Sequence, residues 1–331
     1  MNLLWRGTIG GRRYCERLAV HCELLYDRTA RAERRAHVFV VNLMRVRSSI
    51  VCAAALGIAV ALPVGARGEG IDTEHLFGFM IGTDVGTPGE REFQSQSGGQ
   101  LGKRDGTYRS AAQEFEVEWV PAANFRVELG TSFAAHDIHN VDGLDNRRQL
   151  GWQGLSLDLR YRWLDRDVAP FGMTFGLESH ADRIDEVSAA PGRVYGTGLT
   201  LAFDRELVPN VVLAALNLSY QPEWTRLAGS PFTEHDATLA VATAVMVQPR
   251  PGLLIGGEAR YLRRYDGFGL DALAGQALFV GPTAYLQLSE RSRLTAAWSI
   301  QAWGRASGSA AALDLTNFER HQARIIYGVN F

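Results

Sequence analysis

The stretch with the densest collection of reactive side chains is Ala135 to Asn146 (AHDIHNVDGLDN), which contains two histidines and three aspartates. Imidazole and carboxylate groups this close together are the groups that bind metal ions in proteins. The stretch lacks, however, the first-position Asp of a calcium-binding EF-hand loop, and Asp- and Asn-rich turns are the ordinary composition of exposed loops. We therefore predict a solvent-exposed turn here, no metal site and no cofactor.

Signatures of catalysis are also missing. The sequence contains no GxSxG, no HExxH and no phosphate-binding glycine loop. A His and a Ser on the same face of adjacent strands could form a hydrolase site. Ser179 and His180 are sequence neighbours, however, so on a strand they point to opposite faces, and no His-x-Ser-Asn pattern follows His136. We predict that the protein is not an enzyme.

A larger set of charged side chains occupies every second position of otherwise apolar stretches. The clearest examples are EFEVEW (residues 114–119) and LSLDLRYRW (residues 155–163). A period of two puts the charged groups on one face of a strand and the apolar groups on the other. The predicted charged-face residues are Glu114, Glu116, Glu118, Arg126, Glu128, Asp158, Arg160, Arg162, Glu178, Arg260 and Arg324.

These acids and arginines allow two interpretations, which are compatible. They can pair across adjacent strands and fill a narrow interior. They can also form the charged wall of a channel that selects solutes.

The same alternation predicts twelve strands, at residues 91–103, 109–120, 125–136, 154–165, 170–182, 194–204, 211–223, 236–248, 253–264, 276–288, 293–304 and 322–331. Each is about ten residues long, which is enough to cross a bilayer at a tilt. Short, turn-rich connections alternate with longer ones at 137–153, 184–193, 224–235, 265–275 and 305–321. Short turns on one side and long loops on the other are typical of outer-membrane barrels.

The last nine residues, ARIIYGVNF (323–331), alternate aromatic and aliphatic side chains with Arg, Gly and Asn and finish on Phe331. This pattern resembles the C-terminal strand of Gram-negative outer-membrane β-barrels. The resemblance implies an all-β fold, an antiparallel transmembrane barrel. It also implies that Tyr327, Val329 and Phe331 form the signal read by the barrel-assembly machinery.

Residues 75–83 bear on the number of strands. This stretch (HLFGFMIGT) also alternates, and predicts either a first strand or a short segment tucked into the barrel mouth; a spanning strand here would require fourteen strands in total.

Aromatic residues flank both the short turns and the long loops, as the two membrane interfaces require, whereas a soluble β-sandwich concentrates them in one core.

The first 66 residues predict targeting rather than fold. Basic Met44–Ser49, an apolar run from Ile50 to Val64 and small residues up to Ala66 have the layout of a secretory signal peptide. We expect residues 1–43 to be an upstream extension, residues 67–90 an N-terminal segment and residues 91–331 the barrel. All three cysteines precede residue 67, which fits export through an oxidising periplasm.

Composition excludes some functions. After residue 66 acidic residues outnumber basic ones, which disfavours nucleic-acid binding. We predict a protein of the Gram-negative outer membrane, with outer-membrane lipids, the assembly machinery and small solutes as partners. The predicted function is passive passage of small polar or charged solutes. The alternatives are a structural or surface-interaction barrel with a closed lumen and, less favoured, a lipid-modifying enzyme.

Overall fold

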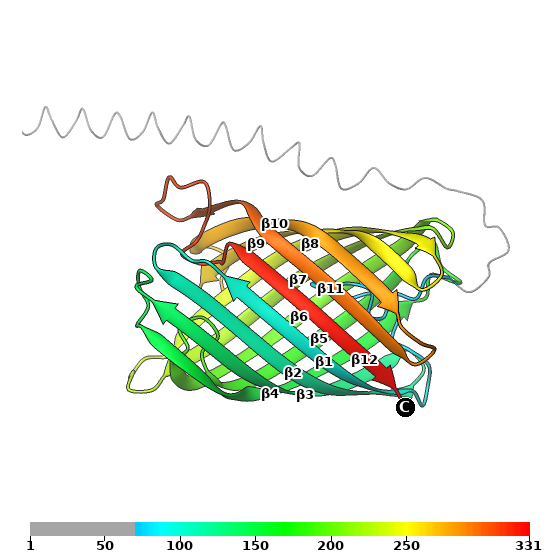
Figure 1. Ribbon diagram of the computed structural model, residues 1–331, viewed down its shortest axis with the longest axis horizontal. Coiled ribbons are helices and arrows are strands. Elements are labelled where there is room, and N and C mark those ends of the chain that lie inside the picture. The colour runs from blue at the N-terminus through cyan, green and yellow to red at the C-terminus, as the bar shows by residue number, and fades with distance from the viewer. Residues whose placement is uncertain (1–69) are drawn as a thin grey trace, which may run out of the picture. The chain divides into compact units, whose positions relative to one another are not determined.

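The computed structural model describes residues 70–331, which form twelve strands in one closed, antiparallel sheet (Figure 1). Each strand pairs with its sequence neighbours, and the last strand pairs with the first to close the barrel. The predicted signal peptide (44–66) and upstream extension (1–43) lie outside the described residues. No helix in the described range is long and apolar enough to cross a membrane.

The strands are β1 (Arg91–Leu101), β2 (Thr107–Ala122), β3 (Phe125–His139), β4 (Arg147–Leu164), β5 (Gly172–Ile184), β6 (Pro191–Val208), β7 (Val212–Leu227), β8 (Glu234–Arg250), β9 (Leu253–Asp266), β10 (Leu273–Gln287), β11 (Ser292–Ala306) and β12 (His321–Asn330). Each corresponds to one predicted strand, so the fold class and the count of twelve are confirmed, and residues 70–331 contain no further strand.

Strand lengths differ from the prediction. They range from 10 residues in β12 to 18 in β4 and β6. Residues 147–152, predicted as loop, pair with β3, and the register shifts between Ser132 and Phe133. The prediction failed because Arg147, Arg148 and Gln149 show no apolar alternation, and backbone pairing can continue into water without one.

The connections define two ends of the barrel. At the short-turn end, tight hairpin turns contain an Asn at positive φ, as at Asn124 (66°) and Asn210 (56°). The connections at the long-loop end are residues 102–106, 140–146, 185–190, 228–233, 267–272 and 307–320. The chain enters β1 and leaves β12 at the short-turn end (Figure 1).

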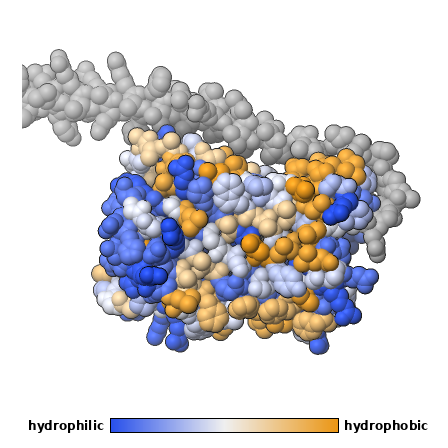
Figure 2. Space-filling view, in the orientation of Figure 1, coloured by the Kyte–Doolittle hydropathy of each residue, from blue (hydrophilic) through white to orange (hydrophobic). Residues whose placement is uncertain are grey.

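The outer surface exposes large apolar side chains. Leu129, Leu155 and Trp163 are 62%, 56% and 70% exposed, and they occupy outward positions of neighbouring strands β3 and β4. Figure 2 shows apolar residues over the flank of the barrel and hydrophilic residues gathered at the long-loop end. A flank of this kind is stable against lipid rather than water.

The N-terminal segment (residues 70–90) is not a barrel strand. It lies inside the barrel, where Ile71, Leu76, Phe77 and Met80 are buried. Of the two predictions made for residues 75–83, the tucked-in segment is therefore confirmed and the spanning strand is wrong.

Candidate functional site

The interior is the candidate site, and the N-terminal segment fills its short-turn half. The apolar side of the segment packs against one part of the wall. The buried cluster joins Ile71, Leu76, Phe77 and Met80 to inward residues of β7, β8 and β9, namely Leu213, Ala215, Ala242, Ala244, Met246 and Leu254. These inward positions are apolar because they face the apolar side of the segment rather than water.

The polar side of the segment is held by two buried carboxylates of the wall. Glu258 of β9 accepts hydrogen bonds from the backbone N–H groups of Gly78 (2.8 Å) and Phe79 (3.0 Å). Asp204 of β6 accepts bonds from the Thr83 N–H (3.0 Å) and from the Thr73 hydroxyl (2.7 Å). Backbone donors buried without water need such acceptors, so these two residues fix the path of the segment.

Arg166, in the connection between β4 and β5, binds both the N-terminal segment and Asp204. Its guanidinium donates to Asp204 (3.1 Å), to the Thr73 hydroxyl (3.0 Å), to Asp84 and to the Ile71 carbonyl. One side chain thus links the turn, the wall and both ends of the buried segment. Sequence reasoning missed Asp204, Glu258 and Arg166 as anchors, because nothing local marks the segment that they bind.

A charged cluster lies where the segment meets β1–β4. Arg126 is fully buried and contacts Glu74 (2.8 Å), Glu118 (3.6 Å) and Glu128. Arg160 continues the cluster to Glu128 (3.5 Å) and Asp158 (3.0 Å), and Arg293 of β11 pairs with Glu92. His75 of the segment lies among these groups. Burial, followed by the charges of Arg293, Arg126 and Arg160, lowers the pKa of the His75 imidazole well below its usual value, so the ring is neutral.

The eleven predicted charged-face residues all lie on the inner face. Glu118, Arg126, Glu128, Asp158 and Arg160 meet in the cluster just described. The others are spread along the wall: Glu114 bonds Ser156, Glu116 bonds Gln96, Arg162 contacts Asp84 and Asp165, Arg260 bonds Gln322, and Glu178 and Arg324 face the lumen. Their role as a channel wall stays a prediction.

On the long-loop side of the N-terminal segment, the lumen is open to solvent at the height of Glu178, Arg324 and Gly98; we call this height the open level. Glu178 of β5 pairs in register with inward Asp158, so it also points inward, and yet it is exposed. Arg324 of β12 is exposed too, and its guanidinium lies 5.8 Å from the Phe79 ring inside the barrel. A Cβ added to Gly98, the register partner of Arg324, would meet no atom within 4 Å. Solvent therefore reaches the wall at this height.

The two charges of the open level stand on different sides of the lumen. β5 and β12 are five strand steps apart in the ring of twelve. A carboxylate and a guanidinium that face each other across water set a transverse electric field, which acts on any charged or dipolar solute between them.

The long-loop mouth is narrowed by two connections. Residues 185–190 fold over the wall, where Ala189 is buried beside Tyr108 and Ile138 and its carbonyl accepts a bond from Gln149 (2.6 Å). Residues 307–320 fold inward as well, and Phe318 packs against Ala277 and Phe279.

Glu186 stands in this mouth with its carboxylate 2.6 Å from the Gln100 amide. Enclosure by the mouth, then the charges of Glu319 and Glu223, raise the pKa of Glu186 to about 7. Its charge therefore changes near neutral pH.

The predicted turn at 135–146 is only partly a turn. Ala135 to His139 belong to β3, so His136 points inward and bonds the Glu186 carbonyl (2.9 Å). His139 contacts Asp137 (3.0 Å) and Asp142 contacts Arg104 (2.8 Å). Of the five side chains that the sequence had grouped, Asp137 and His139 therefore stay together, while His136 points into the barrel.

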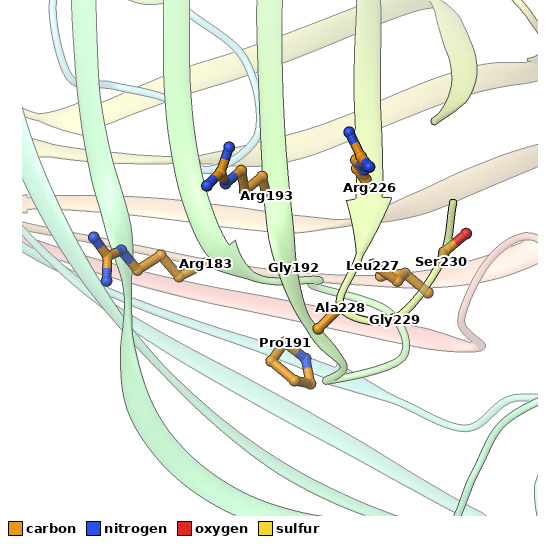
Figure 3. Close-up of a pocket in the computed structure, with 9 residues that line it drawn as sticks. All are labelled: Arg183, Pro191, Gly192, Arg193, Arg226, Leu227, Ala228, Gly229 and Ser230. Atoms are coloured by element: carbon orange, nitrogen blue, oxygen red, sulfur yellow. The ribbon is translucent and has the colours of Figure 1, made fainter. Parts of the chain in front are cut away.

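An open cleft of about 560 Å³ lies on the outside of the long-loop end. Figure 3 shows the side chains that line it, among them arginines of the three adjacent strands β5, β6 and β7. Arg193 of β6 and Arg226 of β7 are direct register partners, and Arg183 of β5 lies 5.6 Å from the Trp152 ring. Like charges directly opposite each other repel, so this arginine cleft favours an anionic group.

The C-terminal strand presents the predicted assembly residues on the outside. Tyr327 and Phe331 are 40% and 68% exposed, and Val329 pairs with Phe93 of β1 as the barrel closes. Their role as an assembly signal stays a prediction.

A closed twelve-stranded barrel with an apolar flank and a charged interior defines an outer-membrane β-barrel of the Gram-negative type. Residues 69–331 match the family described as "Family of unknown function (DUF6662)", and the chain belongs to that family. A search of curated proteins found no match.

Solved structures share the architecture. The COG4313 outer membrane channel from Pseudomonas putida F1 is 10% identical with a TM-score of 0.51, over 75% of this chain and 98% of that one. The translocator domain of the autotransporter NalP from Neisseria meningitidis is 15% identical (TM-score 0.44; 75% and 91% of the two chains). The NanC porin is 10% identical (TM-score 0.41; 72% and 100%). The likeness to the Pseudomonas putida channel concerns the fold.

Proposed function

We propose that this protein is a channel for small polar or charged solutes and that it catalyses no reaction. The observation that supports the proposal most directly is the open level, where Glu178 and Arg324 face solvent from different sides of the lumen. A barrel with a purely structural role gains nothing from exposed charged side chains on its inner wall, whereas a channel uses them to select solutes.

We further propose that the N-terminal segment is the gate of this channel. In the described state it fills the short-turn half, which faces the periplasm in the usual orientation of such barrels. It is attached to the wall by a buried apolar cluster, by the Glu74–Arg126 ion pair and by hydrogen bonds to Glu258 and Asp204. None of these contacts is part of the barrel's own sheet, so the strands can stay paired when the segment moves.

The test is planar-bilayer conductance of the purified protein, folded into detergent and checked for heat-dependent gel mobility. We expect discrete conductance steps. Glu178→Gln removes a negative charge and should lower the preference for cations, and Arg324→Gln should lower the preference for anions. Ser179→Ala, next to Glu178 but on the outer face, is the matched control and should leave selectivity unchanged.

A second variant separates a closed gate from a closed barrel. Glu258→Leu removes the acceptor of the Gly78 and Phe79 N–H groups, and should raise conductance or the frequency of opening. If neither the wild-type protein nor Glu258→Leu conducts, the lumen is closed, and the surface-interaction barrel replaces the channel.

The lipid partner of the proposed channel can also be assigned to a surface. We propose that the arginine cleft holds a phosphate group of an outer-leaflet lipid, because Arg193 and Arg226 need a shared anion. Arg193→Gln with Arg226→Gln should weaken binding to vesicles that contain lipid A, measured by co-flotation, and should leave binding to zwitterionic vesicles unchanged. Equal binding of both vesicle types by wild-type protein contradicts the assignment.

A further inference from the structure

The interior holds a set of side chains that the channel proposal does not use. The Nε2 atom of His75 faces one carboxylate oxygen each of Glu118 (3.4 Å), Glu92 (3.7 Å) and Glu74 (3.8 Å). The ligand atoms of Glu74, His75 and Glu118 all lie within 4.8 Å of one another. Ligands bound tetrahedrally to zinc at 2.0–2.1 Å stand roughly 3.4 Å apart, so the spacing found here is close to that of a metal site.

The His75 nitrogen is buried and has no hydrogen-bond partner. Its side chain is 8% exposed, and the Nε2 atom accepts and donates no bond within the described part of the chain. A buried polar atom without a partner is costly, and natural structures rarely keep one without a reason. Its aim toward three carboxylates indicates that a cation belongs between them.

The pairing of the neighbouring charges leaves room for that cation. Arg126 donates to Oε1 of Glu74, while the oxygen nearest His75 is Oε2. In Glu118 the oxygen nearest His75 is also Oε2, which contacts Arg126 at 3.6 Å and accepts a bond from the Gln94 amide at 3.2 Å. Both carboxylates direct this oxygen toward the imidazole, and neither Oε2 atom accepts a hydrogen bond shorter than 3.2 Å from the side chains named here.

We propose that His75, Glu74 and Glu118 bind a divalent transition-metal ion such as zinc, with Glu92 beside them. An imidazole ligand favours zinc or a similar ion over calcium or magnesium, which prefer oxygen ligands alone. Glu74 and His75 belong to the N-terminal segment and Glu118 to β2, so the ion joins the segment to the wall. A cavity of about 100 Å³ at the short-turn end, lined by His75, Glu92 and Arg293 among others, gives the ion a route of entry.

The experiment is titration of the folded, chelator-treated protein in detergent with Co²⁺, followed by visible absorption, and with Zn²⁺ in competition. We expect one Co²⁺ per chain, with the absorption of a low-coordinate site, displaced by Zn²⁺ and not by Ca²⁺. His75→Gln and Glu118→Gln should each weaken Co²⁺ binding at least about a hundredfold, more than loss of an outer-shell partner costs. His139→Gln is the matched control, because His139 is exposed and lies beside a carboxylate, Asp137.

Folding of each variant is checked by heat-dependent gel mobility. Because two ligand variants are made, the test still stands if one of them fails to fold. The proposal is overturned if wild-type protein binds neither Co²⁺ nor Zn²⁺, if a folded His75→Gln variant binds as tightly as wild type, or if Ca²⁺ competes equally. The measurement does not involve conductance, so the metal site and the channel can fail independently.

Discussion

The two ends of the lumen are closed in different ways. At the short-turn end, the N-terminal segment is buried against strands from all around the barrel, with apolar contacts to β7–β9 and buried ion pairs toward β2 and β3. At the long-loop end, connections 185–190 and 307–320 fold over the wall through smaller contacts.

This difference separates two tasks within one wall. The short-turn half behaves like the core of a soluble domain, because removing the segment would expose apolar side chains and unpaired charges together. The long-loop half borders on water, so its charges can act on solutes with little cost to stability. The contrast predicts that substitutions in the first half change stability and gating, whereas substitutions in the second change selectivity.

The largest expected effect comes from Arg126, which is fully buried among Glu74, Glu118 and Glu128. Arg126→Met keeps much of the volume but leaves buried carboxylates without their partner. It should reduce the free energy of unfolding by about 3–5 kcal/mol, measured by urea-dependent folding into vesicles. Arg109→Met, on the exposed outer face of β2, is the control and should change stability little. Equal effects of the two substitutions would contradict a core-like short-turn half.

A pair of glycines inside the barrel compares the filled and the open level directly. A Cβ on Gly82 would lie 1.8 Å from the Thr73 carbonyl oxygen, whereas a Cβ on Gly98 would meet nothing within 4 Å. Gly82→Ala should therefore cost about 1–3 kcal/mol through overpacking and loosen the gate, seen as more frequent opening in bilayers. Gly98→Ala should leave stability and gating near wild type. If Gly98→Ala is the more disruptive change, the assignment of filled and open levels is reversed.

Much of the barrel could be predicted from the sequence because the residues of a membrane strand alternate between an apolar, lipid-facing side and a polar, lumen-facing side. EFEVEW (114–119) places its glutamates inward and its aromatic residues outward, as predicted. LSLDLRYRW (155–163) likewise places its aspartate and arginines inward and its apolar and aromatic residues outward. Strand ends were less predictable. Beyond the membrane, the ladder continues on backbone hydrogen bonds alone, so Arg147–Gln149 give no periodic signal.

The site was less predictable than the wall. HLFGFMIGT (75–83) alternates like a strand, and only the three-dimensional pairing of Gly78 with Glu258 and of Thr83 with Asp204 shows that it lies inside. The partners of these bonds are separated by 180 and 121 residues. No local pattern encodes such a contact, and the same holds for His75 with Glu118.

The smallest expected effect is a pH dependence at the mouth. Because the pKa of Glu186 is raised to about 7, its carboxyl group is mostly neutral below that pH and charged above it. The preference for cations in bilayer recordings should therefore rise as the pH increases through about 7, by the effect of about one charge. The groups that act on Glu186 are Glu319, Glu223, His180 and the Gln100 amide.

Glu186→Gln should flatten this pH profile, because the amide stays neutral on both sides of pH 7. Asp145→Asn, an exposed acid in the neighbouring connection, is the control and should keep the wild-type profile. A pH dependence that survives Glu186→Gln but disappears in Glu258→Leu would place the titrating group beside the gate. The two ends of the lumen would then share control of ion selectivity, and the division between a core-like half and a solvent-facing half would no longer hold.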